Sequence, residues 1–487
     1  MRPVNTLLTA SLLVVAFFTP PASAQDPLPA NVQAALAKTE IPVEALSALV
    51  MPLEAGPTAL NYSAGLAMSP ASTMKLLTTI IALEELGPTF RWKTQILSKA
   101  VVKNKSLRGD LYLRGGGAPD LSWERLGHML RSLRALGIQN IVGNIVLDRT
   151  YFQPSRMDLN VPPFDETPDA YYNVIPDALL IESNLSRFEI ATNHNQFHIA
   201  LSPPMANIVL KNRLTLDDKP CSEWEAGWQT PIITSNRAQQ TRITLSGSFP
   251  RDCKISTELN TLERNIYIEQ LIRKLWQEMG GRWNGYISNG QVPDNASLLV
   301  ERLSDTLSDN IKVINKRSDN AMARLLYLTL GSEFVDRKTY SSSLQAADAH
   351  VRQWLQNHGI SSESLVLENG SGLSRLERIS AQQMAALLQA AANSNWFPEF
   401  LTSLPIAAVD GTMRKRLKGS SAEARARVKT GTLKDTSAIA GYVRDIHNKM
   451  WIVVAIVNHP KSVQARPILD EVINWVANGA SNSERVN

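Results

Sequence analysis

The stretch 69–88 constrains the fold more than any other part of the chain, because it predicts one helix that has to be buried. Ser69 is placed to cap this helix and Pro70 suits its first position, while Gly87 and Pro88 predict its end. A helix that is apolar on almost every side belongs in the interior of a domain. Only the first turn carries reactive side chains. The apolar positions are Met74, Leu76, Leu77, Ile80, Ile81, Leu83 and Leu86.

The reactive side chains are Ser72 and Lys75, whose spacing of three puts them on one face of the helix within reach of each other. Serine becomes a nucleophile when a base removes its proton, and lysine is such a base when burial or nearby positive charge lowers its pKa. The helix N-terminus adds a positive field and backbone N–H groups that suit an oxyanion. A capping serine followed by a solvated lysine is the alternative interpretation, which a buried helix disfavours.

The first 24 residues predict a cleavable secretory signal. Arg2 is followed by the apolar run Leu7–Phe18 and by Ala22-Ser23-Ala24, a typical cleavage site. The run is too short for a permanent anchor, so we expect a mature chain that is exported to the periplasm and has no transmembrane segment. Cys221 and Cys253 are the only cysteines, and in an exported chain they predict one disulfide.

Composition excludes some classes of function. The net charge of +5 is too small to indicate a nucleic-acid partner. His194 and His198 lack the glutamate of a zinc-binding helix, and we expect no metal and no cofactor. The densest basic cluster is interpreted mainly as solvated surface; it comprises Arg414, Lys415, Arg416, Lys418, Arg425 and Arg427.

The pattern of secondary structure changes twice along the chain. Short strands are predicted in the middle, and helical periodicity returns from about Ser304. An antiparallel set of strands and a final helix close the chain. The predicted strands are 110–114, 144–148, 196–201, 241–245, 425–432, 437–443 and 450–457, and the final helix is 467–476.

Two further motifs carry candidate chemistry. Of the S-x-N triplets Ser308–Asn310 and Ser318–Asn320, we expect the first to be a helix start capped by Ser308. The second is expected at a junction between helices, where side chains project into a cleft. Lys429-Thr430-Gly431 occurs once, on a predicted strand. Its lysine and threonine suit the free carboxylate of a peptide, and its glycine lets a substrate backbone lie close.

Ser-x-x-Lys, Ser-x-Asn and Lys-Thr-Gly in this order form the set described for penicillin-binding proteins and serine β-lactamases. The long interval between Ser72 and Ser318 narrows the resemblance to one class of these proteins. The chain resembles the class C low-molecular-mass penicillin-binding proteins, which are D-alanyl-D-alanine carboxypeptidase/endopeptidases of the penicillin-binding protein 4 type. Family-like segments also occur at 317–320, 369–375 and 410–413, with Asn369 in place of the family's usual aspartate.

The resemblance implies an α/β (α+β) fold. We expect a serine β-lactamase/transpeptidase-like domain with a five-stranded antiparallel sheet flanked by helices, plus two inserted, mostly β domains. The catalytic domain would comprise residues 25–90 and 294–487, inserted domain II residues 91–165 and 255–293, and inserted domain III residues 166–254.

The resemblance also implies roles for the motif residues. Ser72 would attack the D-Ala-D-Ala carbonyl and Lys75 would accept its proton, with the backbone N–H groups of Ser72 and Thr432 as the oxyanion hole. Ser318 would pass a proton to the departing D-alanine and Asn320 would hold the substrate amide. The residues expected to bind substrate are Lys429, Thr430, Gly431 and Thr432.

Asp148 and Arg375 are candidates for a side-chain pocket that takes a diaminopimelate residue, although a turn cap and a helix-end charge explain them equally well. The expected partners are peptidoglycan stem peptides ending in D-Ala-D-Ala and, as covalent inhibitors, β-lactam antibiotics. The sequence does not decide the oligomeric state, a homodimer included.

Two rival hypotheses stay open. A serine β-lactamase shares the acylation motifs but deacylates fast; we find no E-x-x-L-N segment, and Tyr171–Asn173, which matches Y-x-N, lies far from Lys429 in sequence and is taken as chance. A non-catalytic cell-wall-binding or β-lactam-sensing protein with the same fold has no need of Ser72 and Lys75.

Overall fold

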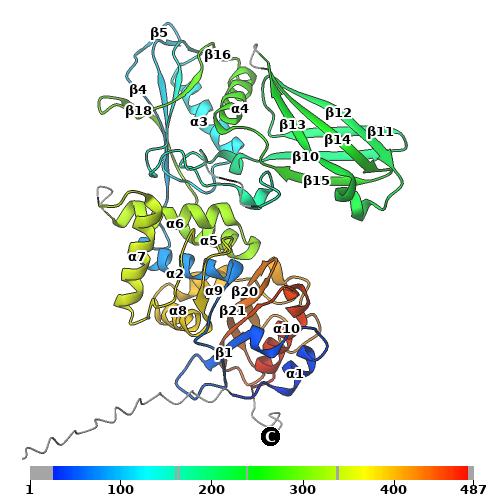
Figure 1. The fold of residues 1–487 in the computed structure, drawn as a ribbon. Helices are drawn as coiled ribbons and strands as arrows, with labels where there is room; N and C mark the ends of the chain where they lie inside the picture. The colour runs from blue at the N-terminus through cyan, green and yellow to red at the C-terminus, as the bar shows by residue number, and fades with distance from the viewer. Residues whose placement is uncertain (1–25, 160–161, 163–164, 237–239, 336–338, 481–487) are drawn as a thin grey trace, which may run out of the picture.

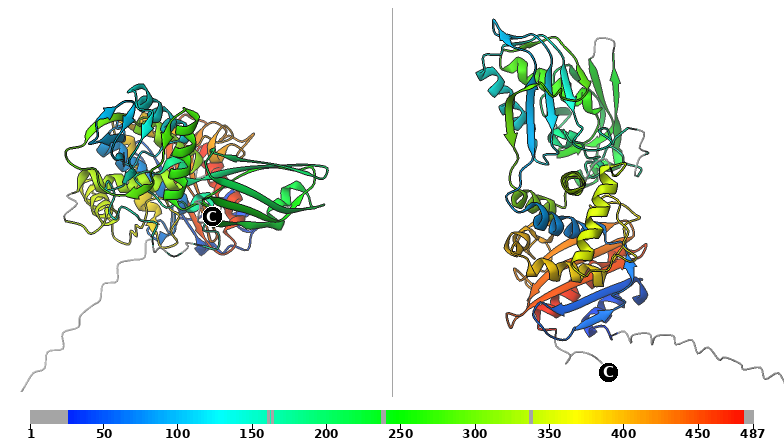
Figure 2. Two further views of the ribbon diagram at one scale, coloured as in Figure 1. Left: turned by 90° about the horizontal axis from the view of Figure 1, so that it is seen from above. Right: turned by 90° about the vertical axis from the view of Figure 1, so that its left-hand side faces the viewer.

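The computed structural model describes residues 26–159, 162, 165–236, 240–335 and 339–480. The predicted secretory signal, residues 1–24, lies outside the described residues. Figure 2 shows an elongated molecule with two parts, which we call the main unit and the inserted region. The main unit combines the chain before residue 91 with the chain after residue 303, and the inserted region is the stretch between them (Figure 1).

Both ends of the chain build the central sheet of the main unit. Within the described residues its strands are in the order β2-β1-β22-β21-β20, and all neighbours are antiparallel. This confirms the strands predicted at 425–432, 437–443 and 450–457. The bounds are β1 Leu46–Pro52, β2 Leu60–Tyr62, β20 Ala426–Leu433, β21 Thr436–Arg444 and β22 Met450–Asn458.

The two faces of this sheet bury different sets of helices, because successive side chains of a strand point to opposite faces. On β21, Ala438, Ala440 and Tyr442 join a core with the helices that carry the motifs, whereas Ile439 and Val443 join a second core. The second core includes α1 (Ala30–Leu36) and α10 (Arg466–Ala477), as predicted for 467–476. The helices of the first face are α2 Lys75–Leu86, α5 Leu307–Arg317, α6 Asn320–Phe334, α7 Ser343–Asn357, α8 Ala381–Asn393 and α9 Phe397–Ser403 (Figure 1).

The helix predicted from Ser69 is confirmed in its burial and its end but not in its start. Gly87 ends α2 with a φ of 78°. Before α2 the chain forms a 3₁₀ turn, Ala71–Met74, and the hydroxyl of Ser69 does not cap it. The reason is a tertiary contact: the side chain of Asn458 on β22 accepts from Ser69 N at 2.8 Å and donates to Ser69 O at 3.0 Å. Ser69 is therefore anchored to the sheet rather than to the helix.

One part of the inserted region is a five-stranded sheet in the order β17-β9-β7-β4-β18 within the described residues. It confirms the strands predicted at 110–114 and 144–148, and α3 (Trp123–Ala135) and α4 (Arg264–Glu278) pack nearby (Figure 1). The bounds are β4 Lys93–Ser98, β7 Leu111–Gly115, β9 Ile145–Asp148, β17 Ile287–Asn289 and β18 Ser297–Leu303. A smaller sheet joins β5 Val102–Lys103, β6 Ser106–Leu107, β8 Asn140–Ile141 and β16 Arg282–Trp283.

The other part contains two three-stranded sheets and the disulfide. The strands predicted at 196–201 and 241–245 are confirmed, and Cys221 and Cys253 are bonded as predicted. The sheets are β11-β10-β15 and β12-β14-β13. β15 pairs with β10 up to Leu259, beyond the predicted end of inserted domain III at residue 254, and the domain boundaries stay predictions. The bounds are β10 Ser186–Asn193, β11 Gln196–Ser202, β12 Ile208–Asp217, β13 Trp228–Ser235, β14 Thr241–Pro250 and β15 Lys254–Leu259.

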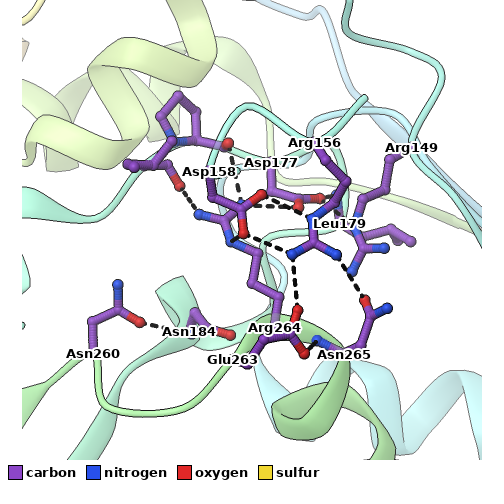
Figure 3. Close-up of polar contacts among 12 residues, drawn as sticks. Arg149, Arg156, Asp158, Asp177, Leu179, Asn184, Asn260, Glu263, Arg264 and Asn265 are labelled. Atoms are coloured by element: carbon purple, nitrogen blue, oxygen red, sulfur yellow. Dashed lines mark hydrogen bonds and ion pairs between the residues drawn. The ribbon is translucent and has the colours of Figure 1, made fainter. Parts of the chain in front are cut away.

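A buried ionic network holds the segment that runs from the inserted region toward the main unit (Figure 3). Asp177 accepts from Arg149 Nε at 2.9 Å and from Arg264 Nη1 at 2.8 Å, and all three side chains are buried. Arg264 belongs to α4 and also donates to the carbonyl of Ile175. The network therefore ties β9, α4 and the segment around Asp177 to one another. Among the described residues no helix is long and apolar enough to cross a membrane.

Candidate active site

Lys75 lies at the centre of the site, at the first position of α2. Its Nζ is 2.9 Å from Ser72 Oγ, 2.6 Å from Asn320 Oδ1 and 2.5 Å from the carbonyl oxygen of Ser371. The structure thus brings together the predicted nucleophile, base and amide, and it adds a backbone carbonyl that the motifs do not contain.

These three contacts orient the amine. Asn320 Oδ1 and the Ser371 carbonyl only accept, so they take N–H groups from Lys75. A neutral amine has two N–H groups and one lone pair. With both N–H groups engaged, the lone pair is left for Ser72, whose hydroxyl then donates to it. The arrangement is that of a serine aligned with its base.

Burial of Lys75 favours its neutral amine, which is the form that acts as a base. The Lys75 side chain is fully buried, and burial lowers its pKa to about 7, a shift that the negative charges of Asp319 and Glu377 oppose. A large fraction of Lys75 is therefore neutral near neutral pH. The buried environment predicted for this helix is thus what makes its lysine a base.

Lys429 lies on β20 and forms the second half of the site. Its Nζ donates to Ser318 Oγ at 2.9 Å and to the carbonyl of Thr430 at 2.8 Å. Burial, followed by the nearby charge of Lys75, lowers the pKa of Lys429 well below its usual value. Thr430 Oγ1 lies 2.8 Å from Thr412 Oγ1, which links this strand to the predicted family-like segment 410–413.

The second S-x-N triplet occupies the junction between α5 and α6, as predicted. Ser318 ends α5 in the left-handed conformation, with a φ of 63°, and the Asp319 carboxylate caps α6 by accepting from Met322 N. Asn320 begins α6, and while its Oδ1 accepts from Lys75, its Nδ2 donates to the carbonyl of Tyr172 at 3.1 Å. Asn320 therefore connects Lys75 to the inserted region.

The first triplet does not reach the site. Thr306, and not Ser308, caps α5, so the predicted cap is corrected by two residues. Asn310 is buried and donates to the carbonyls of Asp305 and Thr306. Its role is to close the first turn of α5.

A cavity of ≈1070 Å³ opens over these residues and continues between the main unit and the inserted region. Lys75, Lys429 and Gly431 do not line it and lie behind its wall. The hydroxyl groups of Ser72 and Ser318 therefore line the cavity, and the two lysines that contact them lie behind its wall. Its lining includes Ser72, Ser318, Asn320, Thr430, Thr432 and Arg375.

Gly431 has a packing role that the sequence did not predict, and its contact with a substrate stays a prediction. A Cβ at this position would lie 2.5 Å from the carbonyl oxygen of Pro70 and 3.1 Å from Ser72 N. Such a distance to backbone leaves no room for a side chain. The glycine therefore lets β20 pack against the turn that carries Ser72.

Of the two residues predicted for a side-chain pocket, one lines the cavity and the other does not. Arg375 lines the cavity, but Asp148 does not: it is buried at the end of β9, where it accepts from Val292 N and Thr150 N. It serves the sheet of the inserted region. Among the carboxylates that line the cavity is Asp165, which accepts from Tyr172 Oη and Asn173 Nδ2. No motif marked Asp165.

The roles of three further residues at the site were not predicted from the sequence. Tyr171 and Tyr172 line the cavity, although their distance from Lys429 in sequence had suggested a chance pattern. Tyr172 contacts Asn320 through its backbone carbonyl, which no side-chain motif reports. Ser371 also acts through its carbonyl, but the glycine-rich segment 369–375 was a usable signal for it.

Comparison with known proteins gives consistent results. The chain matches the D-Ala-D-Ala carboxypeptidase 3 (S13) family over residues 28–478. It is 30% identical over 386 residues to a D-alanyl-D-alanine carboxypeptidase from Actinomadura sp. (strain R39), which covers 77% of this chain and 70% of that protein. It is 28% identical over 404 residues to the D-alanyl-D-alanine carboxypeptidase DacB of Haemophilus influenzae, with 82% of each chain covered.

The fold agrees with a solved structure. The crystal structure of penicillin-binding protein 4 (dacB) from Haemophilus influenzae has a TM-score of 0.76 to this chain at 24% sequence identity, covering 92% of this chain and 98% of that chain. The predicted fold class is thereby confirmed. Since the family match also spans nearly all of the described residues, the chain belongs to the D-Ala-D-Ala carboxypeptidase 3 (S13) family, as its three motifs predicted.

Proposed function

We propose that this chain cleaves D-Ala-D-Ala ends of peptidoglycan stem peptides through an acyl-enzyme on Ser72. One observation carries the proposal: two fixed acceptors engage the N–H groups of Lys75 and leave its lone pair for Ser72 Oγ. A serine activated in this way suits acyl transfer.

In the acylation step, Lys75 takes the proton of Ser72 while Oγ attacks the carbonyl carbon of the D-Ala-D-Ala bond. The developing oxyanion accepts from the backbone N–H groups of Ser72 and Thr432. The C–N bond then breaks as Ser318 passes its proton to the nitrogen of the departing D-alanine, and the proton that Lys75 took from Ser72 restores the Ser318 hydroxyl. Water then attacks the ester, the bond between the carbonyl carbon and Oγ breaks, Oγ takes one proton of the water, and the shortened peptide leaves with the water oxygen in its new carboxyl group.

The terminal carboxylate of the substrate suits the floor formed by Thr430 and Thr432. Both residues line the cavity, and the buried amine of Lys429 lies behind them, bonded to the Thr430 carbonyl. Burial favours the neutral form of this amine, and a bound carboxylate raises its pKa again and so stabilises the charged form. A carboxylate there gains two hydroxyl donors and a cation that its own charge stabilises. A β-lactam carries an equivalent carboxylate, and its ring opens without losing the amine, so the drug stays attached to Ser72 as an ester.

The side-chain pocket is proposed with a changed partner. Arg375 and Asp165 line the same cavity from the main unit and from the inserted region respectively. A guanidinium and a carboxylate in one cavity fit a side chain that ends in an amino acid, as diaminopimelate does. Asp165 thus takes the role first expected of Asp148.

The same chemistry extends to cross-linked peptides, in which the departing amine belongs to a second stem peptide. A cavity of ≈1070 Å³ that continues toward the inserted region offers room for such a leaving group. We place this activity in the periplasm, following the signal expected at residues 1–24.

The test is intact-protein mass spectrometry of the mature chain after brief incubation with benzylpenicillin, in the wild type, Ser72→Ala and Ser308→Ala. Ser308 is the matched control because it belongs to the S-x-N triplet outside the cavity. An adduct of one drug mass on the wild type and Ser308→Ala, and none on Ser72→Ala, is the expected result.

Other outcomes separate the rival hypotheses. Rapid loss of the drug without an adduct indicates a β-lactamase. An intact drug without an adduct indicates a non-catalytic binder and contradicts the proposal. Release of D-alanine from a pentapeptide ending in D-Ala-D-Ala then measures the carboxypeptidase activity directly.

A further inference from the structure

Glu377 is a fully buried carboxylate in the segment between the glycine-rich loop 368–372 and α8. Within the part of the chain that the structure describes, it forms no ion pair. Its Oε1 accepts from the backbone N–H groups of Glu368, Asn369 and Gly370 at 3.2, 3.0 and 2.9 Å. A buried charge is costly unless it is compensated: burial raises the pKa of Glu377, and the backbone N–H groups at Oε1 oppose that shift, whereas Oε2 has no hydrogen-bond partner among the described residues.

The opposite side of the same loop faces α2. The carbonyl of Gly370 accepts from Thr78 Oγ1 at 2.6 Å, and the carbonyl of Ser371 accepts from Lys75 Nζ at 2.5 Å. The loop therefore lies between the Glu377 carboxylate, which takes its N–H groups, and α2, which donates to its carbonyls. Any displacement of the loop moves the Ser371 carbonyl relative to Lys75.

The loop has little freedom to compensate. Gly372 has a φ of 78°, and a Cβ there would lie 1.7 Å from the carbonyl oxygen of Ala71. The loop backbone is thus packed against the turn that carries Ser72. This contact fixes one side of the loop and α2 fixes another. The carboxylate of Glu377 binds the N–H groups on the remaining side.

The charge of Glu377 also reaches Lys75. Besides burial, the charges that act on Lys75 are those of Asp319 at the start of α6 and Glu377 from this segment, while Lys429 on β20 is itself affected by the charge of Lys75. Both carboxylates raise the pKa of Lys75 against the lowering by burial. On α6, Arg324 and Tyr327 experience the charge of Glu377 as well.

We propose that Glu377 is a positioning residue for acylation: its carboxylate holds loop 368–372 so that the Ser371 carbonyl engages one N–H group of Lys75 and the lone pair stays directed at Ser72. The inference rests on the proposed function, in which Lys75 is the base. It assigns a buried carboxylate outside the three motifs to the reaction.

Two substitutions separate geometry from charge. Glu377→Asp keeps the charge but withdraws the carboxylate from the loop by one methylene. Glu377→Gln keeps an oxygen for the loop N–H groups but removes the charge. The control is Glu363→Gln, an exposed carboxylate earlier in the same connection, whose side chain supports no loop.

The experiment measures the rate of Ser72 acylation by benzylpenicillin as a function of pH, together with the melting temperature of each variant. Glu377→Asp is expected to lower the plateau rate about 10- to 100-fold, since small displacements of reacting groups cost this much. Glu377→Gln is expected to shift the acidic limb to lower pH by up to about one unit, because a charge that raises the pKa of Lys75 is lost. Glu363→Gln should match the wild type.

A lowered melting temperature with the wild-type plateau in Glu377→Asp and the wild-type limb in Glu377→Gln would mean a purely structural role and overturn the inference. If Glu377→Asp does not fold, Thr78→Val loosens the same loop at the Gly370 carbonyl, and an unchanged plateau there counts against the inference too. A wild-type chain that is not acylated refutes the proposed function instead, so the two failures are distinguishable.

Discussion

The side-chain amide of Asn320 donates to the backbone carbonyl of Tyr172 at 3.1 Å while its oxygen accepts from Lys75. One residue therefore contacts both the catalytic base and the inserted region. The inserted region contributes to the site, because its segment around Tyr172 is part of the polar network at Ser72.

Acylation of Ser72 should rise with pH through about 7. Burial lowers the pKa of Lys75 to about 7, and only its neutral form accepts a proton, so protonation below this pH removes the base. The rate of adduct formation with benzylpenicillin from about pH 5 to about pH 9 measures the profile. Lys75→Arg should lower the rate by about 10²- to 10⁴-fold, because a guanidinium does not give up its proton. A pH-independent rate would contradict Lys75 as the base.

Asn320→Ala should slow acylation about 100-fold, because Lys75 loses one of the two acceptors that orient it. Asn310→Ala, in the other triplet, should retain the acylation rate and instead lose about 1–3 kcal/mol of unfolding free energy, since two backbone carbonyls lose their donor. Rate and urea unfolding are measured on both. Equal acylation rates in Asn320→Ala and Asn310→Ala would show that Asn320 does not orient Lys75.

Gly431→Ala should destabilise the main unit by about 1–3 kcal/mol, because the new Cβ meets the backbone of the Ser72 turn. The same conflict should reduce acylation. The control is Gly65→Ala, where the nearest atom to a new Cβ is Gln382 Oε1 at 3.8 Å. Chemical denaturation gives the stabilities, and a Gly431→Ala variant as stable as Gly65→Ala would show that the contact can relax.

Asp165→Asn should raise KM for a pentapeptide that carries diaminopimelate, without changing acylation by benzylpenicillin, which lacks that side chain. The reason is that the carboxylate lines the cavity near the side-chain pocket and does not contact Ser72 or Lys75. Asp148→Asn should leave this KM unchanged and lower the melting temperature, because Asp148 bonds Val292 N inside the inserted region. The reverse result would restore Asp148 as the pocket residue.

Asp177→Ala should cost about 3–5 kcal/mol of unfolding free energy, because two buried guanidinium groups lose their common acceptor. Asp218→Asn is the surface control: its pair with Arg251 has an 89% exposed carboxylate and should matter by less than about 1 kcal/mol. Differential scanning calorimetry compares the variants. If Asp177→Ala unfolds like Asp218→Asn, the network does not hold the segment around Tyr172.

Side-chain chemistry at short range was predictable from the sequence. The spacing of Ser72 and Lys75, the end of the helix at Gly87 and the alternation of 425–432 depend on neighbours in the chain, and the structure has all three. The junction at Ser318 followed from the composition of the helix after it.

Contacts set by tertiary structure were not predictable in the same way. Ser69 had the identity of a cap, but Asn458 from the far end of the chain engages its backbone. Asp148 and Asp165 are both aspartates in strand ends or loops, and only the fold decides which one lines the cavity. The carbonyls of Ser371 and Tyr172 have no side-chain signature, because any residue supplies a carbonyl.

The pairing of β1 with β22 has a consequence for the order in which the molecule forms. Leu46 lies opposite Val457, so β1, near the start of the chain, cannot pair until β22, near its end, is available. Contacts of such long range form slowly. The inserted region also pairs distant strands, β4 with β18 among them, but all of its strands precede residue 304, so it can close its sheets before β22 is available. We therefore expect the reactive centre to be the last part of a newly made chain to assemble, and a chain cut short before β22 to keep a folded inserted region but no assembled site around Ser72.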